Sequence, residues 1–110
     1  MQGYDQEKAL AFIRRTVKRK AFDELGPGID GYLAQAQALD LQYMREAGVL
    51  DEAGYEGDGF YDDDEAMEFI VEEIVKIRGL DEDEAILVAS LVDAYLGAQE
   101  AYLQKEGLSQ

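Results

Sequence analysis

The chain of 110 residues contains no cysteine and no histidine. It therefore cannot form disulfides, thiolate nucleophiles, Cys/His zinc sites, iron–sulfur clusters or a histidine-based catalytic relay. Serine occurs only at positions 90 and 109 and threonine only at position 16, so hydroxyl nucleophiles are scarce as well. Gly54, Gly57 and Gly59 lack the lysine and the strand-to-helix context of a phosphate-binding loop. The sequence predicts a protein that is not an enzyme and that holds no cofactor and no metal.

Long hydrophobic runs are also missing. The longest nearly apolar stretch, residues 85–98, is interrupted by Ser90 and Asp93 and is too short to span a bilayer. The N-terminal residues do not show the charged segment, apolar segment and cleavage site of a secretion signal. These features predict a cytoplasmic protein that is not in a membrane. A chain with 47% hydrophobic and 32% charged residues is typical of one compact domain. At this length the core can be stable without a disulfide or a structural metal.

Positive charge is scarce and unevenly distributed. Ten basic residues face twenty-five acidic ones, which gives a formal charge of −15. Residues 1–22 contain six basic and two acidic residues, for +4, whereas residues 23–110 contain four basic and twenty-three acidic residues, for −19. A field of that sign repels phosphate backbones and anionic lipids. We therefore expect no direct binding to nucleic acid or membrane, and we expect a basic protein as the partner.

Helical spacing of apolar residues dominates the chain and predicts an all-α, single-domain, four-helix bundle-like fold. Helices are expected at about 6–25, 30–47, 63–78 and 82–104. Gly26-Pro27-Gly28 ends the first helix. A glycine-rich acidic loop, 48–61, joins helices 2 and 3, and its ends are expected to be pinned to the core by Val49, Leu50, Phe60 and Tyr61. The apolar stripes of the first two helices are Leu10, Ile13, Val17 and Ala21, then Tyr32, Leu33, Ala36, Leu39 and Tyr43.

Two near copies of one short motif, Tyr61–Ala66 and Leu80–Ala85, begin nineteen residues apart. Each predicts a capping box at a helix start, with Asp62 pairing with Glu65 and Asp81 with Glu84. The spacing predicts a helical hairpin with a minimal turn at Gly79. The third helix should bury Met67, Ile70, Val71, Ile74 and Ile77. The fourth is apolar nearly all round, which is typical of a central helix or an oligomer interface.

The candidate partner site lies on the third helix. We define the acidic face as the six carboxylates that the sequence places there: Asp62, Asp63, Asp64, Glu68, Glu72 and Glu73. Tyr55 and Phe60, in the preceding loop, are candidate aromatic anchors for a partner, because such rings bury a large area on binding. The same two rings are equally suited to packing on the bundle, and the sequence alone does not separate these interpretations.

Two further charge clusters have alternative interpretations. Asp58, Asp62 and Asp64 offer an irregular calcium site, but the EF-hand spacing fails and helix capping explains the same acids. The basic run on the first helix suits either an acidic or phosphate-bearing ligand or internal compensation of charge, and the acidity of the remaining chain favours compensation. That run comprises Arg14, Arg15, Lys18, Arg19 and Lys20.

Asp93 is the most unusual single residue, because it interrupts the most apolar segment of the chain. If it is buried, it needs a partner such as Arg14 or Arg15. If it is exposed, it belongs to a polar stripe where the fourth helix meets solvent. The second interpretation is favoured.

These observations together predict a non-catalytic protein–protein interaction or regulatory module that presents the acidic face to a basic partner. Two alternatives stay open. The first is a nucleic-acid mimic whose carboxylates replace phosphates and inhibit a DNA-binding protein, although the positive first helix counts against it. The second is a structural homo-oligomer built on helix 4.

Overall fold

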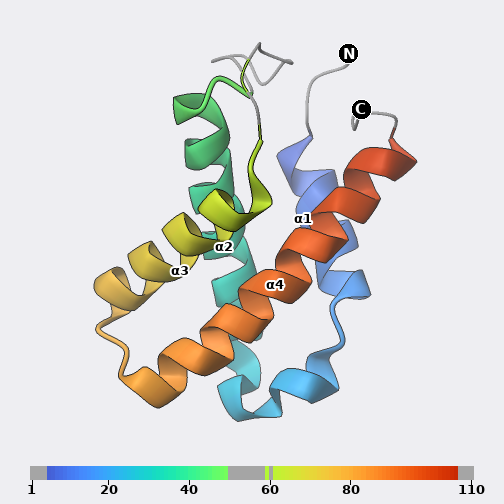
Figure 1. The fold of residues 1–110 in the computed structure, drawn as a ribbon. Coiled ribbons are helices and arrows are strands. Elements are labelled where there is room, and N and C mark those ends of the chain that lie inside the picture. The colour runs from blue at the N-terminus through green and yellow to red at the C-terminus, as the bar shows by residue number, and fades with distance from the viewer. Residues whose placement is uncertain (1–4, 50–58, 60, 107–110) are drawn as a thin grey trace.

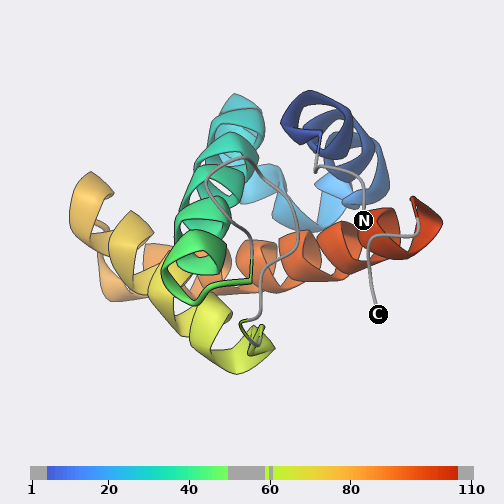
Figure 2. The same cartoon turned by 90° about the horizontal axis from the view of Figure 1, so that it is seen from above.

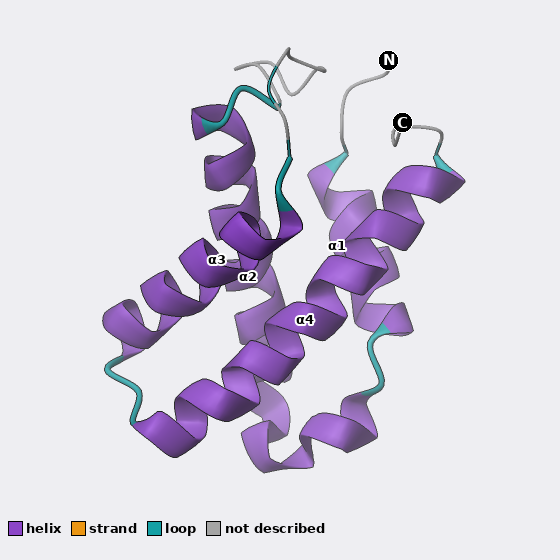
Figure 3. Cartoon of the chain, in the orientation of Figure 1, coloured by secondary structure: helices purple, strands orange, loops and turns teal. Residues whose placement is uncertain are grey.

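The computed structural model describes residues 5–49, 59 and 61–106, and over these ranges the fold is all-α. The chain forms α1 (Gln6–Thr16), a 3₁₀-helix η1 (Arg19–Gly28), α2 (Ile29–Glu46), α3 (Asp63–Arg78) and α4 (Glu82–Lys105) (Figure 1). The described residues contain no strand (Figure 3). The predicted four-helix bundle-like fold is confirmed. Tyr55, Phe60 and most of the predicted loop lie outside the described residues.

Helix α4 is the central element of the bundle. It contacts α1, α2, α3 and η1, and it runs obliquely across the other helices (Figures 1 and 2). Its buried side chains include Val88, Leu91, Val92 and Tyr95, and only its outward face carries exposed Ile86, Ser90, Asp93 and Gly97. Because neighbours cover several sides of α4, its apolar character is largely accounted for by packing within one chain.

The first helix is shorter than predicted. The prediction of one helix over 6–25 is wrong, because α1 ends at Thr16 and Val17 has extended backbone angles (φ −66°, ψ 131°). On a continuous helix Ile13 and Phe22, nine residues or two and a half turns apart, would point to opposite sides. The break lets Ile13, Val17, Phe22 and Ile29 enter one core cluster. Ala21, which the predicted stripe would bury, is exposed.

The other three helices agree with their predicted bounds to within one residue. All five predicted apolar positions of α2 are buried. Gly79 ends α3 in the left-handed conformation (φ 63°, ψ 44°), and the amide of Leu80 donates to the Val75 carbonyl at 3.1 Å. The predicted burial of Ile77 is wrong: its side chain is 63% exposed, because it lies in the last turn of α3, beyond the buried Ile74. The predicted hairpin is confirmed.

The two predicted capping boxes differ. At Asp81 the box is complete, with the Glu84 amide donating to Asp81 at 2.8 Å and the Asp81 amide donating to Glu84 at 3.4 Å. At Asp62 the side chain accepts from the amides of Asp64 and Glu65, at 3.0 and 3.2 Å. The return bond predicted from Glu65 is wrong, because the Asp62 amide donates instead to the Tyr43 hydroxyl at 3.4 Å.

The described ends of the α2–α3 connection are packed on the bundle. Val49 and Tyr61 lie against Leu41 and Met44, as predicted, whereas Leu50 and Phe60 are outside the described residues. The amide of Gly59 donates to the Gly48 carbonyl at 2.7 Å. A Cβ atom at position 59 would collide with the Ala47 carbonyl, so this close approach of two chain segments requires glycine.

Gly97 is a glycine that the fold does not require. It lies on the exposed side of α4, and a Cβ atom there would meet no atom within 4 Å. We expect Gly97→Ala to raise the free energy of unfolding by about 0.5–1 kcal/mol, because alanine loses less backbone entropy in a helix. The matched control Gly79→Ala should lower it by roughly 1–2 kcal/mol, because its left-handed backbone disfavours a side chain. Urea unfolding followed by circular dichroism measures both, and a destabilised Gly97→Ala would contradict the prediction.

Candidate functional site: a buried carboxylate beneath an acidic stripe

Three buried residues of the described core are polar: Gln37, Asp40 and Gln99. Asp40 is 0% exposed, although it belongs to a residue type that is almost never buried without a partner. It lies in the middle of α2, four residues after buried Ala36 and seven after buried Leu33. That spacing turns its side chain into the core.

Hydrogen bonds from two tyrosines and one glutamine satisfy the carboxylate. Tyr61 donates to Oδ1 at 2.7 Å, and Tyr95 donates to Oδ2 at 2.8 Å. The Gln99 amide also donates to Oδ2 at 3.2 Å, and it lies 3.1 Å from the Tyr95 hydroxyl. We call these four residues (Asp40, Tyr61, Tyr95 and Gln99) the Asp40 cluster. It joins α2, α4 and the segment before α3.

The surroundings of Asp40 disfavour its negative charge. Burial raises the pKa of its carboxyl above the usual aspartate range, while the hydrogen bonds from Tyr61, Tyr95 and Gln99 lower it, and the negative charge of Asp63 raises it. The net pKa is raised, because loss of hydration is the largest effect. Burial and the neighbouring Asp40 charge also raise the pKa of Tyr61, which keeps its hydroxyl protonated as a donor.

Tyr43 connects the Asp40 cluster to the start of α3. Its ring packs edge-on against Tyr61, with centroids 5.5 Å apart, and lies 6.3 Å from the ring of Phe69. Its hydroxyl lies 3.2 Å from the Glu65 carboxylate and 3.4 Å from the Asp62 carbonyl. The first turn of α3 is therefore held by side chains of α2 rather than by its own cap alone.

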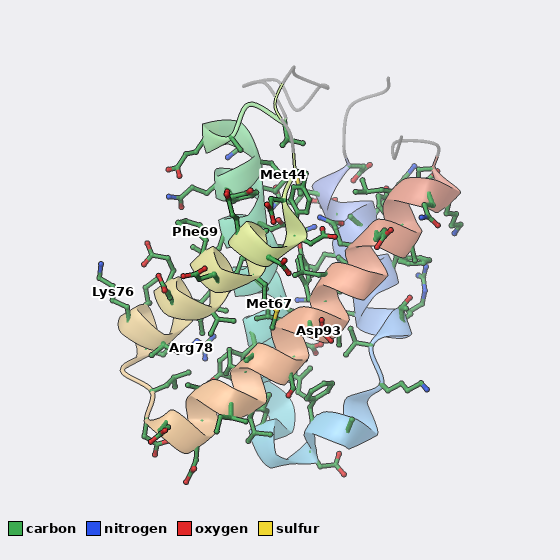
Figure 4. All side chains as sticks on the ribbon, in the orientation of Figure 1. Met44, Met67, Phe69, Lys76, Arg78 and Asp93 are labelled. Atoms are coloured by element: carbon green, nitrogen blue, oxygen red, sulfur yellow. The ribbon has the colours of Figure 1, made fainter. Side chains whose placement is uncertain are left out.

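The structure divides the acidic face into two groups. Asp64, Glu68 and Glu72 recur every four residues on the solvent side of α3, and all three are exposed. Among the described residues, no side chain forms an ion pair or hydrogen bond with these three carboxylates. We call Asp64, Glu68 and Glu72 the acidic stripe. Lys76, one turn later, points away from the bundle (Figure 4).

The other members of the predicted site have different surroundings. Asp62 is half-buried, and its carboxylate accepts the hydrogen bonds that cap α3. Glu73 is half-buried and lies outside the stripe. Asp63 is exposed, but its charge acts on the buried Asp40. Tyr55 and Phe60 lie outside the described residues.

Asp93 is exposed on α4 (Figure 4), so the hypothesis that it is a buried member of an ion pair is wrong and the polar-stripe interpretation is confirmed. Arg14 instead pairs with Asp30, with Nε 3.6 Å from Oδ1. Arg14 Nη2 also donates to the Asp30 carbonyl at 3.4 Å. One cation of the basic run therefore compensates an acid of the same chain, whereas Arg15 and Lys18 are exposed.

The described residues lack two features. They contain no group of three or more Asp or Glu side chains placed to hold a metal ion, and Asp58 of the calcium hypothesis lies outside them. Their helices include none that is both long enough and apolar enough to cross a bilayer.

The Asp40 cluster is the feature that sequence reasoning missed, although the spacing carried a signal. Asp40 falls on the same helical stripe as Leu33 and Ala36, and Tyr95 and Gln99 stand one turn apart on the apolar side of α4. A polar residue on a stripe that is otherwise apolar indicates a buried hydrogen-bonding group. The sequence predicts that Tyr61 packs on the core but gives no sign that its hydroxyl meets Asp40, because Tyr61 precedes α3 and lies on no helix.

No family model matches the chain, and neither a curated protein nor a solved structure matches it.

The raised pKa of Asp40 predicts a specific pH dependence of stability. Between the unfolded and the folded pKa the folded state binds more protons, so the contribution of Asp40 to stability is full at low pH and is lost as pH rises through its folded pKa. The free energy of unfolding of wild type relative to Asp40→Asn should therefore fall as pH rises from about 4.

Chemical denaturation at a series of pH values measures this difference. Asp93→Asn is the matched control, because it removes the same charge from an exposed position of the chain. Its difference from wild type should vary much less with pH. Equal pH profiles for the two variants would contradict the assignment of a raised pKa to Asp40.

Proposed function

We propose that the protein is a non-catalytic interaction module that binds a basic protein partner through the acidic stripe. The observation that carries the proposal is the run of three exposed carboxylates, Asp64, Glu68 and Glu72, without an ion pair to any described side chain. Residues 62–78 contain seven acidic and two basic residues, for a formal charge of −5. Complementary charge of this kind increases association rates and selects partners by sign.

The surroundings of the stripe support a protein as the partner. A rigid helix presents the carboxylates at intervals of one turn, or about 6 Å, which matches the spacing of lysine or arginine side chains on a second helix. The charge of −19 on residues 23–110 would repel polyanions but extend the attraction for a basic surface. The partner implied by this chemistry is a helical or extended segment rich in lysine and arginine.

The absence of catalysis is part of the proposal, and the residues that could act as nucleophiles support it. The hydroxyl of Thr16 donates to the Phe12 carbonyl of its own helix at 2.8 Å, and Ser90 stands exposed on α4 without histidine anywhere in the chain. Asp40 has a raised pKa, but it is enclosed by its donors in the core. A general acid has to reach its substrate, so we assign Asp40 a structural role.

A variant that neutralises the stripe tests this function. We expect Asp64→Asn, Glu68→Gln and Glu72→Gln together to weaken binding of a basic partner by about tenfold or more at 0.15 M salt, because three charge pairs are lost. Affinity capture from lysate identifies the partner, and titration calorimetry then measures its affinity for each variant. Binding should also weaken as salt is raised.

The matched control neutralises three exposed acids elsewhere: Asp23→Asn, Asp93→Asn and Glu100→Gln. It changes the net charge by the same amount and should keep most of the affinity. If both variants lose affinity equally, the chain attracts its partner by net charge and the stripe has no special role. Capture of a DNA-binding protein that DNA displaces would favour the nucleic-acid mimic.

A further inference from the structure

The three donors of the Asp40 cluster are not equally fixed. Tyr95 and Gln99 belong to central α4 and are 0% and 2% exposed, so moving either requires unpacking the bundle. Tyr61 is half-buried, lies on no helix and stands one residue before the N-cap of α3. Of the three hydrogen bonds to Asp40, only the one from Tyr61 can break without disturbing α4. The Tyr61 side is therefore the easiest route by which water can reach the carboxylate.

We propose that the hydrogen bond from Tyr61 to Asp40 is a proton-linked latch that holds the first turn of α3, and with it Asp64 of the acidic stripe, on the bundle. When Asp40 is protonated the cluster is neutral and the latch is closed. When Asp40 ionises, moving Tyr61 away loses a hydrogen bond that favours the carboxylate but lets water reach its charge. Because loss of hydration is the largest effect on the closed state, ionisation favours opening. As a mode of regulation, the latch rests on the proposed function: a closed latch aligns Asp64 with Glu68 and Glu72.

The titratable groups around Asp40 act in opposite directions, because Tyr61 and Tyr95 lower its pKa whereas Asp63 raises it. From α3, the charge of Asp63 disfavours ionisation of Asp40, and no cation is among the groups that shift its pKa. The connection contributes Tyr61 and α4 contributes Tyr95, both as neutral donors. On α2 itself, Tyr43 packs behind Tyr61 and lies 3.2 Å from Glu65. Helix α1 meets α2 one turn earlier, where Gln37 donates to the Gln6 carbonyl at 2.8 Å.

Linkage gives the sign and the size of the effect. Burial raises the pKa of Asp40 in the closed state, and hydration returns it toward its usual range in the open state. The open fraction therefore grows as pH rises between the two pKa values, by up to about tenfold per pH unit, because one proton is released on opening.

Amide hydrogen exchange of the full chain, followed by NMR between pH 4.5 and 8, tests the latch without any partner. The Ala66 amide reports on the first turn of α3, since it donates to the Asp62 carbonyl at 2.9 Å. The Leu91 amide, on buried α4, is the reference. After correction for the intrinsic rate, we expect protection of Ala66 to fall by up to about tenfold per pH unit where Asp40 ionises. Dilute urea at constant pH should lower protection of Leu91 but leave that of Ala66 unchanged, because the latch opens without global unfolding.

Two variants and one direct titration complete the test. Asp40→Asn should remove this pH dependence, and Tyr61→Phe, which keeps the ring against Tyr43, should lower protection of Ala66 at low pH and flatten its profile. The titration follows the NMR chemical shift of the Asp40 carboxyl carbon against pH in the wild-type chain, beside that of exposed Asp93. This measurement does not depend on whether a variant folds. If Asp40 and Asp93 titrate over the same pH range, or if dilute urea lowers protection of Ala66 and Leu91 in parallel, the latch is overturned.

The two proposals fail separately. Full partner binding by the stripe variant would remove the proposed function and leave the exchange result unaffected, because no partner takes part in it. Conversely, a flat exchange profile for wild type removes the latch and leaves the acidic stripe as the proposed binding surface.

Discussion

The constraint on which the rest of the structure depends is the burial of one carboxylate, Asp40, at the centre of a helical bundle. An isolated charge there would cost several kcal/mol, so the fold has to surround it with donors or hold it protonated. Tyr95 and Gln99 reach it from α4, and Tyr61 reaches it from the segment before α3. Meeting this requirement constrains how α4 is rotated against α2 and holds the segment before α3 against the bundle.

The same constraint links the core to the acidic surface. Tyr61 stands directly before Asp62, the cap of α3, and Tyr43 holds that cap from α2. The first turn of α3 is therefore positioned by interactions that cross the bundle, and the exposed stripe of Asp64, Glu68 and Glu72 begins in that turn. Buried polar contacts give a core a defined arrangement at some cost in stability. Here the arrangement that they define is that of the proposed binding helix.

Acidity has several physical roles in this chain. Asp62 and Asp81 cap helices, and Asp63 and Glu82 lie in first turns where the helix dipole favours negative charge. Asp30 pairs with Arg14. Only part of the surplus charge is left exposed without a described partner, and the acidic stripe belongs to that part. Acids that only contact solvent and acids that bind a partner contribute equally to the composition, so only their surroundings can separate them.

The sequence by itself determined the all-α class, the bounds of α2, α3 and α4, the hairpin at Gly79 and the complete cap at Asp81, because each depends on spacing and on contacts between near neighbours in the chain. Only the tertiary structure decided where α1 ends, since Phe22 has to join Ile13 in one core. It likewise replaced the return bond of Glu65 with Tyr43 and placed three of the six predicted acids, Asp64, Glu68 and Glu72, along one exposed side of α3. The Asp40 cluster joins residues up to 59 positions apart. Such contacts exist only after the helices have packed, so the spacing could indicate that Asp40 is buried but not which side chains reach it.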